Sequence, residues 1–410
     1  MRLRVVFVLG SILLGCARPQ TMHANMAQPR QSPRAIDFEA RLYDVLRAQP
    51  GNLFFSPASI RAALTLTYGG ARDETAQELR DALRLPAGDA AQAEMADRLR
   101  RWLDLGNDGA AKDGAQLRLH LANRLWARHG LPLEPRFVTL ARDRYGATIG
   151  ELDFDDPSRS LDAIDTWVSH ETDGTIPRLL SAGDIATSTR LMLVNAIYFK
   201  ATWTNPFDPR FTQAAPFFGA TPGLQAQLML RRSHFAYAEF PGGQLLELMY
   251  GKGAIVLDVL LPATPDGLPR LEQQLVDGAL PGWLASLRPE NVAVALPRFH
   301  ATWRANLTAS LRALGITRLF SADDAQLSGI VADRPLNVSQ IVHQAVLAVD
   351  ERGSEAAAAS GVLITSELIS NRHPEAAKSF RADHPFVFVI RVRDSDEILF
   401  MGRLVTPDAP

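Results

Sequence analysis

The amino-acid sequence predicts an α+β fold in which amphipathic helices come first and the strands of a large mixed sheet follow. Apolar residues repeat at the spacing of an amphipathic helix at Phe38, Leu42, Val45 and Leu46. Apolar residues alternate with other residues, as in a half-buried strand, at Val292, Val294 and Leu296. Residues 386–390 form a continuous apolar run, which is typical of a buried strand.

The other expected elements follow the same order along the chain. Further helices are predicted at residues 57–69, 73–84 and 90–104. A further strand is predicted where apolar residues alternate at Leu117, Leu119 and Leu121. Beyond Pro33 no repeat, long linker or change of composition indicates a boundary. We therefore interpret residues 34–410 as a single domain.

The composition is that of a soluble globular protein. The chain has 410 residues, of which 47% are hydrophobic and 21% are charged, enough for a substantial core. Its 43 lysines and arginines against 45 aspartates and glutamates give a formal net charge of -2. No basic block is long enough to indicate contact with nucleic acid, so nucleic acid is not an expected partner.

The first residues have the pattern of an export signal. Arg2 and Arg4 precede an apolar run that is too short to span a bilayer, so residues 1–15 are interpreted as a signal peptide. The run ends in LLGC, which resembles a bacterial lipobox and predicts lipidation of Cys16. The protein would then be anchored in the cell envelope, with residues 16–33 as a flexible tether. The alternative is plain secretion with an incidental cysteine.

No motif for catalysis or metal binding stands out. The sequence has no G-x-S-x-G elbow, no H-E-x-x-H pair and no glycine-rich phosphate loop, and its single cysteine lies in the export segment. The nine histidines show no ligand spacing. His343, in a strand-like apolar stretch, is interpreted as a hydrogen-bonded core histidine rather than a catalytic base. We therefore expect no enzyme activity, no metal and no cofactor.

Residues 349–367, VDERGSEAAAASGVLITSE, fit neither an ordinary loop nor an ordinary helix. No proline, which a central strand excludes, occurs from Arg352 through Arg372. Alternate positions form an uncharged, mostly small set: Ser354, Ala356, Ala358, Ser360, Val362 and Ile364. The intervening positions carry the one charge of this stretch: Glu355, Ala357, Ala359, Gly361, Leu363 and Thr365. Because a strand has period 2, the segment is compatible with a strand that has one small, uncharged face. The alternative is a short surface helix or an inert alanine-rich linker.

Five separate stretches resemble segments of the serpin family in order and spacing. They are NLFFSPASIRAALTLTYGGARDETAQEL at 52–79, LMLVNAIYFKATWTNPFDP at 191–209, LGITRLFSADDAQLSGI at 314–330, VSQIVHQAVLAVDERGSEAAAAS at 338–360 and HPFVFVIRVRDSDEILFMGRLVTP at 384–407. The resemblance extends along almost all of the mature length. The sequence is therefore identified as resembling a serpin of the bacterial exported or lipoprotein type.

The resemblance implies the serpin fold, with three β-sheets, eight or nine helices and an exposed reactive loop at about residues 351–380. It also implies a monomer that inhibits serine or cysteine proteases by suicide. The protease cleaves the loop, forms its acyl-enzyme and is trapped covalently as the loop inserts into the central sheet. If about twelve residues insert, the new backbone hydrogen bonds contribute on the order of 6–18 kcal/mol. This is comparable with the ~5–15 kcal/mol stability of an ordinary domain, so a metastable uncleaved fold is expected.

The same resemblance implies roles for individual residues. The hinge at the base of the loop comprises Glu351, Gly353, Ser354, Glu355, Ala356, Ala357, Ala358 and Ala359. The shutter, a hydrogen-bonded cluster where the strands part, comprises Ser56, Ser59, Asn195 and His343. The breach, where insertion begins, comprises Trp203 and Arg298. Glu351 is expected to pair with Arg298. The alternative interpretation of the shutter is four satisfied core polar groups.

Counting from Gly353 by the usual family interval predicts a reactive bond between Glu367 and Leu368. An acidic residue at this position suits a protease with a basic primary pocket, such as a glutamyl endopeptidase. The far side of the loop, LISNRHPEAAKSFRADHP, is longer than usual, so Ser366, Leu368 and Arg372 remain alternatives as the residue before the cut.

Two other functional classes remain open from the sequence. One is a non-inhibitory serpin that acts as a carrier, chaperone or surface binding protein, although GSEAAAAS lacks the charged, bulky or proline residues typical of that class. The other is a hydrolase on a different scaffold.

Overall fold

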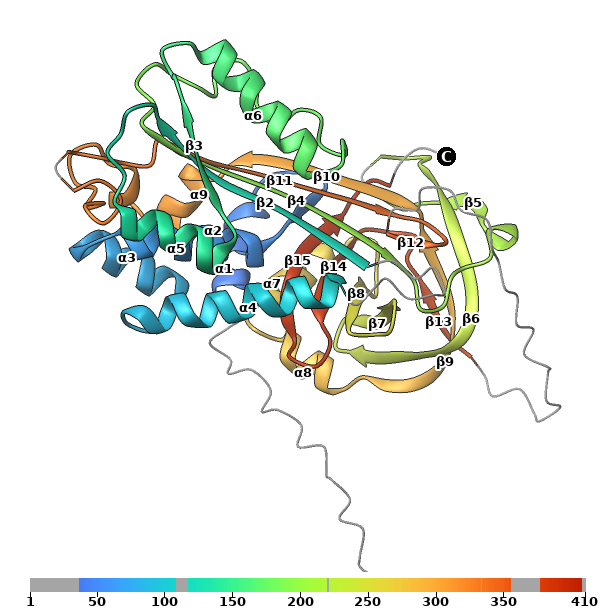
Figure 1. Ribbon diagram of the computed structural model, residues 1–410. Coiled ribbons are helices and arrows are strands. Elements are labelled where there is room, and N and C mark those ends of the chain that lie inside the picture. The colour runs from blue at the N-terminus through green and yellow to red at the C-terminus, as the bar shows by residue number, and fades with distance from the viewer. Residues whose placement is uncertain (1–36, 108–116, 220, 333, 355–376, 408–410) are drawn as a thin grey trace, which may run out of the picture.

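Nine α-helices and two hydrogen-bonded sheets make up the part of the chain that the computed structural model describes (Figure 1). That part comprises residues 37–107, 117–219, 221–332, 334–354 and 377–407. Helices and strands share one main core, which confirms the α+β class. The expected order of helices first and strands later is wrong in part, because strands at Leu53–Phe55 and Leu117–Arg128 lie among the early helices and helices such as Leu268–Val276 come late. None of the described helices is long and apolar enough to cross a membrane.

The helices begin where the sequence predicts them in the first part of the chain. They are α1 Asp37–Leu46, α2 Pro57–Gly70, α3 Asp73–Leu83, α4 Asp89–Asn107, α5 Pro135–Tyr145, α6 Pro157–Glu171, α7 Leu268–Val276, α8 Leu280–Ala285 and α9 Thr308–Ala313. Two 3-10 turns, η2 Pro209–Phe211 and η3 Arg318–Phe320, complete the set among the described residues. The start of α2 shows why a helix begins there. Ser56 caps it by accepting a hydrogen bond from the Ser59 N–H at 3.1 Å, and proline occupies the first helical position.

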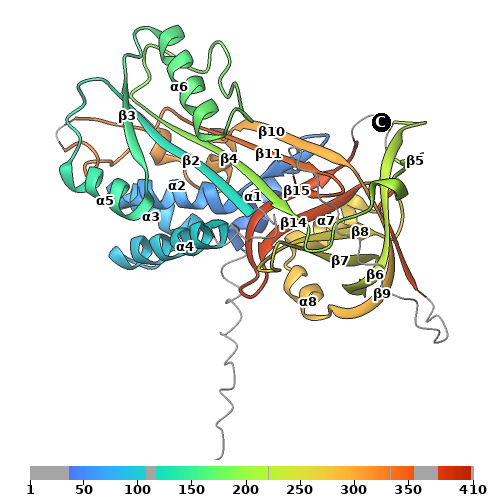
Figure 2. The same ribbon diagram turned by 45° about the vertical axis from the view of Figure 1, so that its right-hand side comes forward.

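The six-stranded sheet has the order β10-β11-β12-β4-β2-β3. Its strands are β2 Leu117–Arg128, β3 Thr148–Leu152, β4 Leu191–Thr202, β10 Phe299–Asn306, β11 Gln340–Val349 and β12 Gly353–Ser354. The alternation predicted from Leu117 is confirmed as the start of β2. The two faces of the six-stranded sheet are covered by different helices, with α6 on one face and α2 on the other (Figure 2).

The second sheet has nine strands, and the long strand β6 connects its two parts. Its strands are β1 Leu53–Phe55, β5 Gln213–Pro216, β6 Gln225–Phe240, β7 Gly243–Tyr250, β8 Ile255–Pro262, β9 Arg288–Pro297, β13 Lys378–Arg381, β14 Phe386–Val392 and β15 Glu397–Leu404. The first part of β6 pairs with β5, and its last part pairs with β7. Two of the three sheets expected from the sequence are therefore continuous through this one strand.

Helix α2 is buried along nearly its whole length between the two sheets. Its polar residues are satisfied locally, since the hydroxyls of Thr65 and Thr67 donate to backbone carbonyls one turn earlier. Arg61 pairs with Glu39 of α1 at 3.0 Å in the interior. Because its polar groups are paired, α2 can be buried on nearly all sides, and this position fixes its start beneath β11 and β4.

Candidate functional site: the hinge and the seam between β11 and β4

The seam is the line along which β11 and β4 meet in the six-stranded sheet. Over most of its length the two strands pair directly and in parallel, from Gln340 opposite Met192 to Val346 opposite Tyr198. At one end β12 lies between them, with Ser354 opposite Val349 on one side and Ala201 on the other. The sheet is therefore open by two residues at one end and closed along the rest of the seam.

Gly353 and Ser354, both predicted as hinge residues, form β12. A Cβ atom added to Gly353 would lie 2.0 Å from the backbone oxygen of Ala201, so no other residue fits without displacing β4. The hydroxyls of Ser354 and Tyr250 are hydrogen-bonded at 2.6 Å in the interior. The chain is thus fixed on both sides at the point where it enters the sheet.

Trp203, predicted at the breach, holds the backbone that leads into β12. Its indole N–H donates to the carbonyl oxygen of Asp350 at 2.8 Å, and its backbone N–H donates to that of Arg352 at 2.8 Å. The indole ring is buried and stacks on the ring of Tyr250, with centroids 4.3 Å apart. The Phe207 N–H donates to the carbonyl oxygen of Glu351, so three consecutive carbonyls are anchored.

Glu351 and Arg298 form the ion pair that the sequence predicts. The Arg298 Nε lies 2.7 Å and 2.9 Å from the two carboxylate oxygens, and the Thr212 hydroxyl also donates to the carboxylate. The Glu351 side chain is 5% exposed, whereas that of Arg298 is 45% exposed. Burial alone would raise the pKa of Glu351, but the hydrogen bonds from Arg298 and Thr212 outweigh it and hold the pKa below its usual value.

We expect the substitution Glu351→Lys to release the hinge and to promote polymerisation, in which the loop of one molecule enters the seam of the next. The lysine would place a second cation beside Arg298 and remove the acceptor of Thr212. Because Arg298 is half exposed, the loss of stability should be about 2–3 kcal/mol, below the range for a fully buried pair. Oligomers should appear in size-exclusion chromatography after mild heating.

Asp208→Lys is the matched control for this experiment. Asp208 pairs with Arg210 at 2.6 Å in the same segment, but neither residue contacts Glu351 through a side chain. The control should remain monomeric under the heating that polymerises Glu351→Lys. A strictly monomeric Glu351→Lys protein would contradict the role assigned to the ion pair.

The four predicted shutter residues are brought together at the middle of the seam. His343 and Asn195 are directly opposite each other on β11 and β4, and the His343 Nδ1 is hydrogen-bonded to the Asn195 side-chain oxygen. The Asn195 amide donates to the Ser59 hydroxyl, and the Ser56 N–H donates to the His343 Nε2 at 3.2 Å. The cluster therefore joins both strands of the seam to the first turn of α2.

The contacts of His343 define its protonation state. The Nε2 accepts from a backbone N–H, so the proton lies on Nδ1 and the ring is neutral. Burial lowers the pKa of His343 to about 3, because the charged form would lose its hydration and face the Ser56 N–H. A neutral ring with one donor and one acceptor satisfies this position, which agrees with the interpretation of His343 as a core histidine.

The pKa of His343 predicts acid sensitivity of the uncleaved protein. The unfolded chain binds a proton at this histidine below about pH 6.5, and the folded chain does so only near pH 3. The contribution of neutral His343 to the free energy of unfolding should therefore be full above pH 6.5 and fall by about 1.4 kcal/mol per pH unit as the pH drops through this window.

His343→Gln isolates this contribution, because an amide keeps a donor and an acceptor but does not titrate. The comparison with the variant is needed because burial raises the pKa of Asp258 to about 6 from 3.8, which gives a slope of opposite sign between those two pH values. Denaturant unfolding at pH 7.5 and 5.0 should show a loss about 2 kcal/mol larger in the wild type. Equal losses in both proteins would contradict the assignment.

Comparison with known proteins decides the family. The family model described as "Serpin (serine protease inhibitor)" matches residues 34–407. The chain belongs to the serpin family. It is 35% identical over 367 residues to leukocyte elastase inhibitor A of Rattus norvegicus, covering 87% of this chain and 93% of that protein. It is 32% identical over 397 residues to an uncharacterized serpin-like protein of Thermococcus kodakarensis, covering 95% and 89%.

Solved serpin structures have the same fold. Uncleaved ovalbumin matches with a TM-score of 0.80 and 30% sequence identity, covering 92% of this chain and 99% of ovalbumin. Serpin48 of the insect Tenebrio molitor, described as highly specific, matches with a TM-score of 0.80 and 30% identity, covering 92% and 98%. The serpin fold predicted from the sequence is confirmed.

Three residues of the serpin's hinge and shutter were missed in the sequence. Asn123 of β2 accepts from the Ser59 hydroxyl at 3.3 Å and from the Asn195 amide. Its signal was present, because it continues the alternation of Leu117, Leu119 and Leu121 and so places a polar residue on the core-facing side of a strand. Tyr250 and Thr212, which contact Ser354 and Glu351, had no such signal because they lie far from the hinge in the chain.

Several predicted residues lie outside the described part of this serpin. They are Cys16, the hinge residues Glu355, Ala356, Ala357, Ala358 and Ala359, and the reactive-bond residues Glu367 and Leu368. The assigned signal peptide, the tether and most of the reactive loop also lie outside it. Their roles stay predictions.

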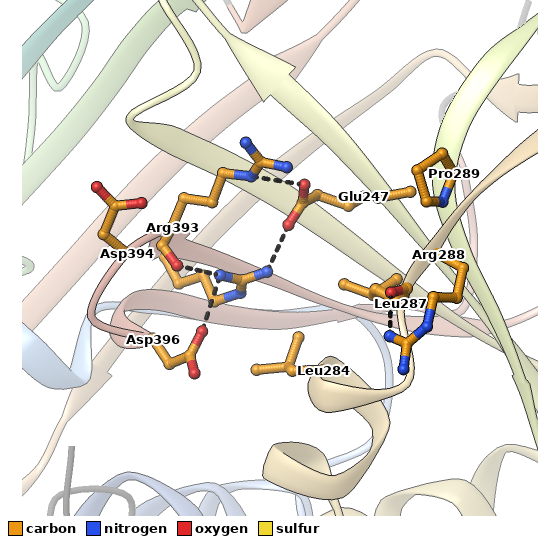
Figure 3. Close-up of a pocket in the computed structure, with 10 residues that line it drawn as sticks. Glu247, Leu284, Leu287, Arg288, Pro289, Arg393, Asp394 and Asp396 are labelled. Atoms are coloured by element: carbon orange, nitrogen blue, oxygen red, sulfur yellow. Dashed lines mark hydrogen bonds and ion pairs between the residues drawn. The ribbon is translucent and has the colours of Figure 1, made fainter. Parts of the chain in front are cut away.

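A buried charge cluster in the nine-stranded sheet of the serpin was not predicted. Arg391 of β14 lies 2.6 Å from Glu247 of β7, 2.5 Å from Asp258 of β8 and 3.0 Å from Asp396. Glu247 also accepts from Arg393, at the edge of a pocket of about 350 Å³ (Figure 3). Because each arginine is paired with carboxylates, the cluster ties three strands together rather than adding a reactive group.

Proposed function

We propose that this serpin is a suicide inhibitor of serine, or cysteine, endopeptidases that traps the acyl-enzyme by inserting its cleaved reactive loop between β11 and β4. The main support for this proposal is that β12 already occupies the open end of the seam, with a strand partner on each side. The loop is covalently continuous with Ser354, so insertion extends a pairing that has begun. No enzyme activity is part of this proposal.

Extending the register of β12 supports the proposal. Ser354 pairs with Ala201 and Val349, so continued pairing would bring Ser360 opposite both Asn195 and His343. The hydroxyl of Ser360 would thus come close to the polar side chains of the shutter. The same register would set Ala358 between Ile197 and Ala345, which face the main core.

The sheet would gain hydrogen bonds by this change. β11 and β4 are parallel to each other, whereas β12 is antiparallel to both. Insertion therefore replaces one parallel pairing with two antiparallel pairings, which are somewhat more stable per residue. The uncharged positions from Ser354 to Ile364 would meet the main core, and Glu355 would lie on the opposite face near Lys200.

We propose Glu367–Leu368 as the reactive bond, with an endopeptidase that prefers acidic residues as the target. A glutamyl endopeptidase has the basic primary pocket that Glu367 requires. Ser366, Leu368 and Arg372 are the alternatives before the cut, because the far side of the loop is long. Cleavage after Arg372 would leave more loop than the seam can take up, which would weaken trapping.

The site of action in this proposal is outside the cytoplasm. The pattern of residues 1–16 supports export and a lipid anchor at Cys16 in a bacterial envelope, or secretion if the cysteine is not modified. The protein would act as a monomer and contact a membrane only through that anchor.

The test is to mix the purified mature protein with a panel of serine and cysteine endopeptidases that includes a glutamyl endopeptidase. A covalent complex should appear on a denaturing gel, and mass spectrometry of the released C-terminal peptide should identify the cleaved bond. Cleavage without a complex by every member of the panel would favour a non-inhibitory serpin.

A further inference from the structure

Two exposed phenylalanines stand at the ends of the short strand β5. Phe211 is 59% exposed and Phe218 is 54% exposed, the highest values among the large hydrophobic residues that the structure describes. Phe211 ends η2, just before β5, and Phe218 follows β5 after one residue. We call residues 211–218 the strap. An aromatic side chain left in water at both ends of one segment favours a contact surface.

Each end of the strap is bonded to one end of the reactive-loop region. Near Phe211, the neighbouring Thr212 hydroxyl donates to Glu351, and the Phe207 N–H donates to the carbonyl oxygen of Glu351. At the other end, the Phe218 N–H donates to the carbonyl oxygen of Asp383 at 2.7 Å, just after β13. The strap thus connects the place where the chain leaves the body at β12 with the place where it returns at β13.

The charges beside the strap are paired with one another. Arg210 bonds to Asp208 at 2.6 Å, and Arg381 bonds to Asp383 at 2.6 Å. The Arg210 guanidinium also lies over the Phe211 ring, 5.9 Å from its centroid, yet both rings stay more than half exposed. Figure 1 shows β5 at the same end of the molecule as β12, with α4 and α5 on the helical side.

We infer that the strap is a second contact surface for the target endopeptidase, which seats an apolar patch of the enzyme on Phe211 and Phe218 before the loop is cut. This inference rests on the proposed function. An enzyme of about 200 residues has a radius of gyration of about 16 Å, so its body is about 40 Å across. The strap is at most about 23 Å long at ~3.3 Å per residue. An enzyme held on a loop between β12 and β13 is therefore wide enough to cover both rings at once.

The contact belongs to the first encounter rather than to the trapped state. Insertion would carry the acyl-enzyme along the seam and away from β5, so the rings contribute only before cleavage. Loss of the rings should slow association without changing the fraction of encounters that end in trapping. This separation distinguishes an interaction surface from a structural role.

The test uses the double variant Phe211→Ser, Phe218→Ser of the full mature chain, with the endopeptidase that gives the fastest complex with the wild type. The second-order rate of complex formation should fall at least about fivefold. The number of inhibitor molecules consumed per enzyme and the melting temperature of the clipped product should stay unchanged. The matched control is Leu103→Ser, Val138→Ser, which removes the other two large hydrophobics that are exposed in the described part of the chain, on α4 and α5, and should keep the wild-type rate.

The outcomes separate this inference from the proposed function. An unchanged rate for the phenylalanine variant, with normal covalent complexes, overturns the strap as a contact surface and leaves the inhibitor mechanism intact. An equal fall for both double variants also overturns it, because any loss of surface hydrophobicity would then suffice. Absence of a covalent complex with the wild type refutes the proposed function, and the strap proposal with it.

Discussion

Cleavage of the reactive loop should raise the melting temperature of this serpin by on the order of 10 °C. In the proposed mechanism, insertion would add a strand that is antiparallel to both neighbours and would replace the direct pairing of β11 with β4. With about ten residues added, the net gain is on the order of 5–15 kcal/mol from backbone hydrogen bonds alone. A domain of this length changes its melting temperature by about 1 °C per kcal/mol, from about 2.1 cal/mol/K of unfolding entropy per residue.

The measurement is differential scanning calorimetry of intact and clipped protein at one scan rate. The clip is made by a protease that cuts the loop without being trapped, and the control is the same incubation with the protease inactivated beforehand. A clipped molecule that melts no later than the intact one would end the insertion model.

The second large effect should come from a charge on the core-facing side of the loop. If the loop inserted in the register of β12, residue 358 would lie between Ile197 and Ala345, which are both buried in the main core. Ala358→Glu would carry an unpaired carboxylate into that core, at a cost above about 3–5 kcal/mol. Each ~1.4 kcal/mol changes a rate tenfold, so insertion of the Ala358→Glu loop should become slower than hydrolysis of the acyl-enzyme. The variant should be cleaved as a substrate, with no covalent complex.

Ala357→Glu is the matched control for the register. The neighbouring position would lie between Tyr198 and Val346, on the face that carries α6, where Val346 is only partly buried. Ala357→Glu should still form covalent complexes. The number of inhibitor molecules consumed for each protease molecule should be at least about tenfold lower than for Ala358→Glu. Equal behaviour of the two variants would mean that the loop does not enter in the register set by β12.

Much of the fold could be predicted because local patterns coincide with burial. The run from Phe386 to Ile390 is a central strand, and the 3.6-residue spacing at Phe38–Leu46 is α1. The four shutter residues and the pair of Glu351 with Arg298 followed from the family resemblance, and the structure brings each set into contact.

Other features could not be predicted because they depend on pairings between distant segments. Nothing in the sequence near Tyr250 indicates that its hydroxyl meets Ser354, 104 residues later. Arg391 comes directly after the apolar run 386–390, and nothing in its neighbourhood in the sequence indicates that it is 2% exposed between carboxylates from β7 and β8. The joining of two sheets through β6 likewise needs the register of a long strand, which composition and periodicity do not specify.

Hydrogen exchange at the Ser56 backbone N–H should report whether β11 and β4 are still paired. Its hydroxyl donates to the carbonyl oxygen of Leu399 in β15 at 2.7 Å and accepts from Ser59, while its amide proton is held by His343. Through its side chain and its backbone N–H together, this one residue contacts a helix and both sheets. When His343 moves aside, that amide proton loses its acceptor and exchanges with solvent deuterium faster. Exchange at this one amide would register the parting of the strands before any loop residue has moved in.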